Sequence, residues 1–189
     1  VVLSDLYALR FDPVLEYAGQ LPELQMIDNV IAARNCDVLT FIYPIWFGLP
    51  PAMIKGYVDR VLGGGFQPKD GKLRADSPFL EGKRMLSITT SASTMAWLAE
   101  QGQLASLREG FDSYLATIFG LARADRIHLD SIVEGMSARY AREQLERVRE
   151  AARAVCADLL HAAHRNEMAG ILQDAASPAS TSAAEIADA

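Results

Sequence analysis

The chain has 189 residues, 50% of them hydrophobic, and a formal net charge of −6 at pH 7. This length and hydrophobic content suit one domain with a well-filled core, while the acidic balance, without a basic stripe, argues against nucleic acid and anionic membranes as partners. The longest uncharged run, 38–54, is broken by prolines, so we expect no stable membrane insertion. The only cysteines, Cys36 and Cys156, suit free thiols in a reducing cytoplasm, with a single disulfide as the alternative.

The first third of the chain predicts, in order, a strand end, a helix, a strand and a helix. Residues 1–3 are apolar and β-branched, which is typical of the end of a strand. A helix is expected over 22–34, where a proline opens a segment with apolar residues at helical spacing. The apolar run DVLTFIY (37–43) indicates a parallel strand buried on both faces. A second helix, also opened by a proline, follows over 51–62 and ends at consecutive glycines.

The rest of the chain continues the alternation of strands and helices. RMLSITT (84–90) is a strand candidate, and apolar residues recur as a helical stripe over 104–121. A strand over 126–132 and a long charged helix over 138–164 follow. The end of the chain, 173–189, is rich in Ala, Ser and Asp, and we expect it to be a disordered tail.

This alternation predicts a doubly wound parallel sheet covered by helices, in one domain over 1–172. Ligands of such sheets bind beyond the carboxyl ends of the strands. At one such end, YPIWFG (43–48) places two aromatic residues beside a rigid proline. At another, TTSAST (89–94) supplies small polar side chains and backbone N–H groups. The two loops together predict a pocket for a planar, partly polar ring system.

Four stretches of the chain share a recognisable pattern: LSDLYALRFDPV (3–14), FIYPIWFGLPPAMIKGYVDRVLGGGF (41–66), GKRMLSITTSAS (82–93) and the strand–helix unit that follows. The second is the most specific, since aromatic–Pro–x–aromatic is followed by Pro–Ala–x–x–Lys–Gly–aromatic–x–Asp–Arg–Val. These stretches resemble the NAD(P)H:quinone oxidoreductase family of flavodoxin-like flavoproteins. The resemblance implies a flavodoxin-like α/β fold, a three-layer α/β/α sandwich around a doubly wound parallel sheet.

The resemblance also implies a cofactor, a reaction and a homodimer. A flavin, FMN or FAD, would lie between the two loops, accept a hydride from NAD(P)H and reduce a quinone or similar acceptor in a two-electron, ping-pong reaction. Carried over by position, the residues that would contact the ring or its ribityl chain are Pro44, Ile45, Trp46 and Phe47. Those that would hydrogen-bond its pyrimidine edge are Thr89, Thr90, Ser91 and Ala92. The substrate pocket would be bordered by Trp97 and Phe66.

Three departures from the family pattern bear on this interpretation. Ser91 and Ala92 stand where the family has two glycines, and they tolerate fewer backbone angles than glycine does. Trp97 and Gln103 match the positions of a tyrosine and a histidine that relay a proton elsewhere in the family, and neither can do so, which leaves the catalytic residues unassigned. The family's first strand and phosphate-binding loop have no counterpart in this sequence. We therefore expect it to be an N-terminally incomplete copy of a longer protein.

Other interpretations remain open at this point. Trp46 and Phe47 could pack in the core or at a dimer interface. The missing relay residues also fit a regulatory subunit, like the potassium-efflux ancillary proteins, that binds flavin or nucleotide without significant catalysis. A one-electron carrier of the flavodoxin type is a third candidate. His161 and His164 lie three apart on a predicted helix without an evident third ligand, so no metal site is expected.

Overall fold

The computed structural model describes residues 1–15, 24–63, 66–69, 72–75 and 80–176, with the backbone alone over 24–27, 66–69, 72–75 and 173–176. The chain divides into two compact units, Val1–Ala141 and Arg142–Ala189. The first contains a sheet and its helices, and the second contains most of one long helix.

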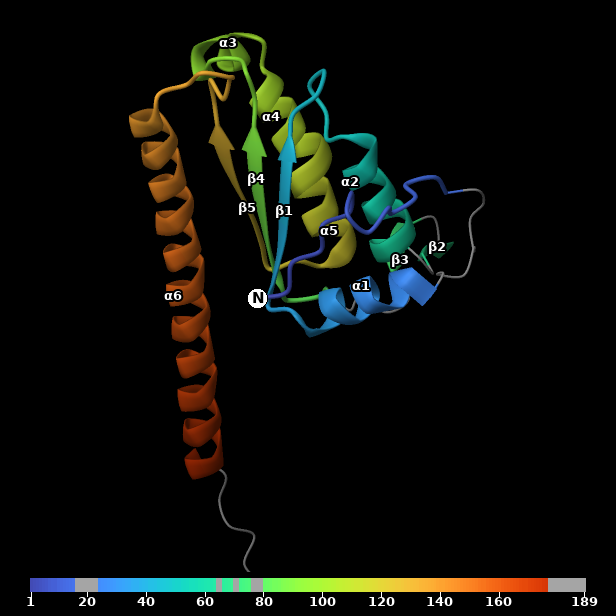
Figure 1. Cartoon of the computed structure of the whole chain (residues 1–189). Coiled ribbons are helices and arrows are strands. Elements are labelled where there is room, and N and C mark those ends of the chain that lie inside the picture. Colours follow the sequence, from blue (N-terminus) through green and yellow to red (C-terminus); the bar gives the residue numbers. More distant parts are fainter. Residues whose placement is uncertain (16–23, 64–65, 70–71, 76–79, 177–189) are drawn as a thin grey trace, which may run out of the picture. The chain divides into compact units, whose positions relative to one another are not determined.

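A parallel sheet forms the centre of the first unit (Figure 1). It contains β1 (Val38–Pro44), β4 (Arg84–Thr90) and β5 (Arg123–Leu129), and β4 lies between the other two. Both pairings are parallel, with the last residue of each strand opposite the last residue of its neighbour, so the three carboxyl ends share one edge. The predicted α/β class with a parallel sheet is therefore confirmed.

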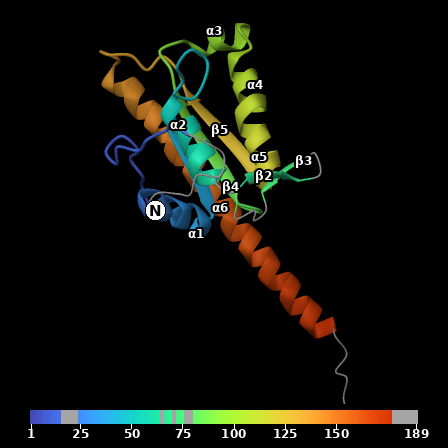
Figure 2. The same ribbon diagram turned by 90° about the vertical axis from the view of Figure 1, so that its right-hand side faces the viewer.

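Helical segments connect these strands, and Figure 2 shows α4 and α5 beside the sheet. Two of the segments are π-helical: η1 continues α2, and η2 joins α4 to α5. The helices predicted over 22–34, 51–62 and 104–121 are confirmed, with small shifts at their ends. The bounds are α1 Leu24–Asn35, α2 Ala52–Tyr57, η1 Val58–Leu62, α3 Met95–Glu100, α4 Gln103–Leu107, η2 Arg108–Ser113 and α5 Tyr114–Phe119.

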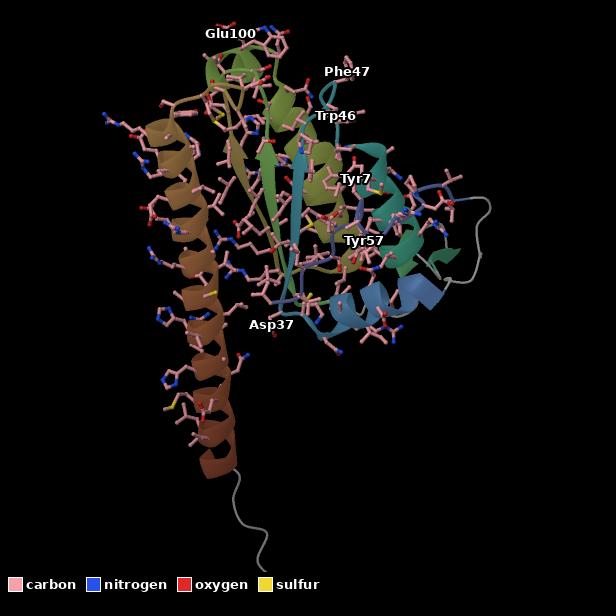
Figure 3. All side chains as sticks on the ribbon, viewed as in Figure 1. Tyr7, Asp37, Trp46, Phe47, Tyr57 and Glu100 are labelled. Atoms are coloured by element: carbon pink, nitrogen blue, oxygen red, sulfur yellow. The ribbon has the colours of Figure 1, made fainter. Side chains whose placement is uncertain are left out.

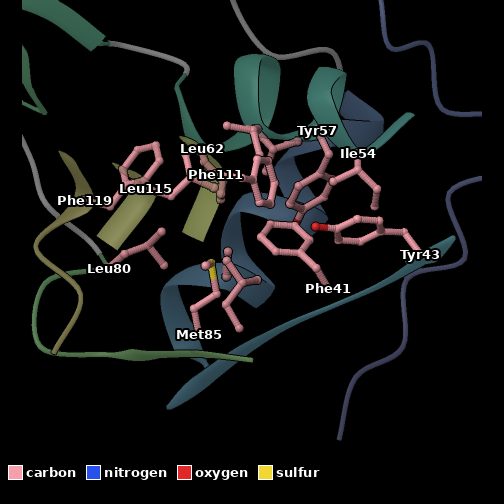
Figure 4. Close-up of a cluster of buried hydrophobic side chains, with 14 of the residues drawn as sticks. Phe41, Tyr43, Ile54, Tyr57, Leu62, Leu80, Met85, Phe111, Leu115 and Phe119 are labelled. Atoms are coloured by element: carbon pink, nitrogen blue, oxygen red, sulfur yellow. The ribbon is translucent and has the colours of Figure 1, made fainter. Parts of the chain in front are cut away.

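One face of the sheet carries the hydrophobic core (Figure 4). In β1, Phe41 and Tyr43 are buried, whereas alternate residues are exposed, Ile42 by 63%. The prediction that this strand is buried on both faces is therefore wrong, because only the face that carries Leu39, Phe41 and Tyr43 contributes to the core. Phe41 packs edge-on against Tyr57 and Phe111, with ring centroids 6.1 Å apart in each pair. Burying such a side chain stabilises the fold by about 2–3 kcal/mol.

Three local predictions differ from the structure. Residues 1–3, which were expected to end a strand, lie in no strand, and their side chains are exposed. Strand β5 spans Arg123–Leu129 rather than 126–132, because its residues pair one for one with those of β4. The antiparallel hairpin of β2 (Phe66–Lys69) and β3 (Lys72–Ala75) was not predicted, and neither was α3.

Helix α6 (Ala138–Ala176) begins in the first unit and forms the described part of the second. It extends beyond residue 164, where the predicted helix ended, and into the segment expected to be a tail. The rest of that tail, 177–189, lies outside the described residues, and the domain end at residue 172 stays a prediction. Both cysteines are free. Among the helices described here, none combines the length and apolar composition needed to cross a membrane.

Candidate functional site

The aromatic loop, residues 45–50, follows β1 at the carboxyl edge of the sheet. Trp46 and Leu49 exchange two backbone hydrogen bonds of 3.0 Å, which close a tight turn. Phe47 and Gly48 form the tip with positive φ angles of 47° and 81°. Trp46 is 60% exposed and Phe47 is fully exposed, and Figure 3 shows both at the end of β1. This exposure excludes the interpretation that the two rings pack in the core of this chain.

Gln103 fixes the aromatic loop from the first turn of α4. Its side-chain Nε2 donates a hydrogen bond of 2.8 Å to the carbonyl oxygen of Gly48. The contact is tight, since a Cβ added to Gly48 would lie 2.5 Å from that nitrogen. A second bond, 2.8 Å from the Ile45 N–H to the Thr90 carbonyl, ties the base of the loop to β4. Gln103 therefore supports the loop from the position where the family pattern has a relay histidine.

The polar loop, residues 91–94, follows β4 and is tied to β5 and the segment after it. The Ser91 N–H donates to the Leu129 carbonyl at 3.1 Å, and the Ser91 carbonyl accepts from the Ile132 N–H at 2.9 Å. Neither Ser91 nor Ala92 has a positive φ angle. The loop therefore does not need the two glycines of the family pattern.

Three backbone donors remain in the polar loop. The N–H groups of Ala92, Ser93 and Thr94 form no hydrogen bond within the part of the chain that the structure describes. Ala92 is exposed and Ser93 is half-buried. Consecutive unpaired N–H groups at the end of a parallel strand can bind a polar or anionic ligand edge.

Asp130, directly after β5, connects the polar loop to the start of α3. Its carboxylate accepts hydrogen bonds from the Met95 N–H at 3.2 Å and from the Ser131 hydroxyl at 3.1 Å. Partial burial alone would raise the pKa of Asp130, but these hydrogen bonds outweigh it and hold the pKa below its usual value. The Ser131 N–H also donates to the Ser93 carbonyl at 3.0 Å. The loops after β4 and β5 thus support each other.

A buried network, here called the polar ladder, lies below the polar loop. At its base Arg126 of β5 pairs with Asp112 of η2 through Nε–Oδ2 and Nη2–Oδ1 contacts of 2.5 and 2.8 Å. Asp112 also accepts from the Ser87 hydroxyl at 2.9 Å. Burial alone would lower the pKa of Arg126, but its hydrogen bonds with Asp112 and the negative charge of that group raise it. The ladder comprises Tyr43, Ser87, Thr89, Ser91, Asp112, Arg126 and His128.

The upper part of the polar ladder leads from Arg126 to the polar loop. Arg126 Nη1 donates to Thr89 Oγ1 at 3.3 Å, and Thr89 Oγ1 lies 3.0 Å from His128 Nδ1. His128 Nε2 in turn lies 3.0 Å from Ser91 Oγ. Arg126 Nη2 also donates to the Tyr43 hydroxyl at 3.0 Å; burial raises the pKa of Tyr43, and Arg126 offsets part of that rise. A continuous series of polar contacts therefore joins a buried ion pair to the polar loop.

The sequence pattern of the flavodoxin-like fold family matches residues 1–157. The chain belongs to this family. Guinea pig (Cavia porcellus) NAD(P)H dehydrogenase [quinone] 1 is 32% identical over 117 residues, which cover 49% of this chain and 42% of that relative. The chain therefore spans less than half the length of this flavodoxin-like relative.

Solved structures share the flavodoxin-like fold. An NAD(P)H:quinone oxidoreductase from Methanothermobacter marburgensis superposes with a TM-score of 0.65 at 24% identity, covering 80% of this chain and 77% of the other. An FMN-dependent NADH-azoreductase from Bacillus anthracis, in complex with FMN, superposes with a TM-score of 0.52 at 14% identity, covering 69% and 61%. At these identities the likeness shows the fold.

The residues predicted to bind a flavin all lie at the carboxyl ends of β1 and β4 or in the loops that follow. Thr89 differs from the others, because its side chain is fully buried and its hydroxyl belongs to the polar ladder. Of the residues predicted to border the substrate pocket, Trp97 is exposed on α3, whereas the side chain of Phe66 lies outside the described residues. The roles of all these residues stay predictions: Pro44, Ile45, Trp46, Phe47, Thr89, Thr90, Ser91, Ala92, Trp97 and Phe66.

Asp112, Arg126 and His128 were not predicted as residues of the site. The available signal was the period-two spacing of Arg126 and His128 within a predicted strand, which places both on one face. If that face is buried, each polar group needs a partner, and the pair indicates a network. The partner Asp112 lies on a helix and could not be located from spacing.

The side chains that the structure describes include no group of His, Cys, Asp and Glu that could hold a metal ion. His161 and His164, which have helical spacing, are both exposed on α6. No metal chemistry is assigned to either unit from these residues.

Proposed function

We propose that this chain is the flavin-binding domain of an NAD(P)H:quinone-type oxidoreductase that works by two-electron, ping-pong hydride transfer. The observation that carries the proposal is the juxtaposition of the exposed aromatic loop with the unpaired N–H groups of Ala92 and Ser93 in the polar loop, at one edge of a parallel sheet. The name of the guinea pig relative supports the reaction class. The FMN complex of the azoreductase supports a flavin as cofactor.

The residues at this edge fit a flavin. Trp46 and Phe47 offer flat apolar surfaces for contact with a planar ring. The N–H groups of Ala92 and Ser93 are suitable donors for the carbonyl and ring-nitrogen acceptors of its pyrimidine edge. FMN and FAD share this ring system, and the proposal includes both.

A bound flavin would supply the redox chemistry, accepting a hydride from NAD(P)H and passing two electrons to a quinone. The contribution of this chain is to bind and orient. The N–H dipoles of Ala92 and Ser93 lie in a loop held by Ser91, so they would stabilise negative charge on a ligand without having to reorganise. Gln103 holds the aromatic loop and keeps Trp46 beside the same edge.

The proposal includes a homodimer in the cytoplasm. Trp46, Phe47, Leu49 and Trp97 are all at least half exposed at or near the carboxyl edge of the sheet. Exposed aromatic and aliphatic side chains grouped in this way are typical of surfaces that bind a partner. Light scattering during size-exclusion chromatography should give twice the chain mass of 20.6 kDa, and a species of single mass would contradict this part of the proposal.

The test is flavin retention by the purified, full-length protein after reconstitution with FMN and with FAD. Wild type should retain a yellow chromophore that NADH or NADPH bleaches anaerobically. Trp46→Ala removes a stacking surface worth about 1 kcal/mol, so it should weaken flavin binding roughly fivefold. Tyr7→Ala is the matched control, because Tyr7 is an aromatic residue of similar exposure, 66%, outside the two loops. A wild-type protein that takes up no flavin would overturn the proposal.

A specific observation favours one other candidate, a regulatory subunit that binds the cofactor without significant catalysis. Gln103 is engaged with Gly48, and Trp97 has no group that can relay a proton, so both expected relay positions lack one. Stopped-flow reduction by NAD(P)H separates the two candidates. Flavin that binds but is not reduced by either nucleotide would favour the regulatory role.

A further inference from the structure

His128 is the part of the polar ladder that touches the polar loop. It lies on β5, is 5% exposed, and has one ring nitrogen 3.0 Å from Thr89 Oγ1 and the other 3.0 Å from Ser91 Oγ. Both partners come from the neighbouring strand and its loop, so the imidazole bridges the end of β4 and the start of the polar loop. The function proposed above does not use this residue.

The contacts of Ser91 fix the direction of its hydrogen bond with His128. Ser91 Oγ donates its only proton to the Ser93 carbonyl at 3.1 Å, so it has to accept a proton from His128 Nε2. Thr89 Oγ1 accepts from Arg126 Nη1, and its own proton has two acceptors within reach, the Ile127 carbonyl at 3.3 Å and His128 Nδ1 at 3.0 Å. The contacts of Ser91 therefore place a proton on His128 Nε2, the ring nitrogen that faces the polar loop.

We propose that His128 is a positioning residue of the cofactor site, which orients the Ser91 hydroxyl and thereby holds the N–H groups of Ala92 and Ser93 in place. The proposal rests on the function proposed above for these two N–H groups. The bond from Ser91 Oγ to the Ser93 carbonyl closes a small loop around Ala92. His128 stabilises this closed conformation of the loop, because its Nε2–H donates a hydrogen bond to the Ser91 hydroxyl oxygen and so holds that oxygen in place.

The pairing also gives a physical reason for a serine where the family pattern has glycine. Glycine at position 91 could not accept the proton of His128 Nε2, which would leave a buried donor without this partner. Ser91 has an ordinary φ angle and so accepts the hydroxyl contact without backbone strain. Ser91 and His128 therefore act as one unit.

The first experiment needs no cofactor. The chain contains only three histidines, so nitrogen NMR of the imidazole groups can assign His128 by comparison with variants at His161 and His164. His128 should carry a proton on Nε2, and Ser91→Ala should shift that signal. His128→Leu should speed amide hydrogen exchange at Ala92 and Ser93 by roughly 3- to 10-fold, as expected for loss of one net hydrogen bond.

The second experiment measures the flavin dissociation constant and midpoint potential of the same proteins. His128→Leu should weaken flavin binding and lower the potential, while His128→Gln, which keeps a side-chain N–H donor, should restore both toward wild type. Leu62→Ala is the control for simple destabilisation, because Leu62 is buried in the core on η1 and makes no hydrogen bond to the polar loop. It should lower the thermal midpoint without changing exchange at Ala92 or the potential.

The outcomes separate the two proposals. Wild type that binds no flavin overturns the proposed function, and the exchange rates of the uncomplexed protein then decide the role of His128 alone. Unchanged exchange at Ala92 and Ser93 in His128→Leu overturns the positioning role, whether or not flavin binds. The positioning role is also overturned if Leu62→Ala reproduces every effect of His128→Leu.

Discussion

The aromatic loop and the polar loop end neighbouring strands of one sheet, but they are held in different ways. The aromatic loop is closed by its own backbone, through the bonds between Trp46 and Leu49, and by one side chain from α4. The polar loop is held by backbone bonds to β5 and the segment after it and, from below, by the buried polar ladder. Its support therefore comes from residues far away in the sequence.

This difference has a thermodynamic consequence. A surface turn closed by local bonds can be perturbed without affecting the core, because its partners can bind water instead. The polar ladder includes a buried ion pair, and removing one member leaves an uncompensated charge in a low-dielectric environment. Changes in the ladder should therefore affect the whole fold, and changes in the aromatic loop should stay local.

The largest effect is expected for Asp112→Asn. The substitution leaves Arg126 charged and buried beside a neutral amide, which should lower the free energy of unfolding by about 3–5 kcal/mol. Denaturant unfolding followed by circular dichroism measures this directly. Glu146→Gln is the control, because Glu146 pairs with Arg149 and Arg153 on the exposed surface of α6 and should give no measurable change. Equal effects at the two sites would remove the distinction between buried and exposed ion pairs.

A smaller, local effect is expected for Gly48→Ala in the aromatic loop. Gly48 has a φ angle of 81°, and the added Cβ would displace the side chain of Gln103, so stability should fall by about 1–2 kcal/mol. The side-chain amide signal of Gln103 in NMR spectra should shift. Gly110→Ala is the matched control, since Gly110 is helical and a Cβ there meets no atom within 4 Å. If Gly110→Ala were the more damaging of the two, the described contact at Gly48 would be incorrect.

The smallest effect is expected at Asp130 and depends on pH. Its pKa is lower in the folded protein than the ordinary 3.8, so its contribution to stability is complete above that pH and is lost as the pH falls through the folded value. Asp130→Asn should cost about 0.5 kcal/mol near neutral pH, after allowance for screening by solvent. The difference between variant and wild type should shrink in acid. Thermal unfolding from pH 7 to pH 2 would test this, and a difference that widens in acid would have the wrong sign.

Much of the fold could be predicted from local patterns. The strand at 84–90 was predicted with its observed bounds, because an apolar run between charged and small residues is a strong signal. The start of β5 was missed, since Arg123 and Asp125 do not resemble strand residues and are placed there by pairing with β4. The short helix α3 was missed because its stability depends on the Thr94 cap and on Asp130, rather than on an apolar stripe.

The candidate site was predictable only in part. The sequence located both loops, because proline, aromatic and small polar residues directly follow predicted strands. The sequence did not identify which groups of the polar loop can bind a ligand. The hydroxyl of Thr89 is used within the ladder, whereas the N–H groups of Ala92 and Ser93 are unpaired among the described residues. The contact of Thr89 with His128 is set by strand pairing rather than by sequence spacing, so the sequence could not show that this hydroxyl is already used.

Flavin binding by the aromatic and polar loops together is the proposal on which the others depend. It can be tested by titrating the full-length protein with FMN while amide and indole NMR signals are followed. We expect the largest shifts at Ala92, Ser93 and the indole of Trp46, with little change at Tyr7. Saturable binding that leaves the signals of Ala92, Ser93 and Trp46 unmoved would contradict the proposal.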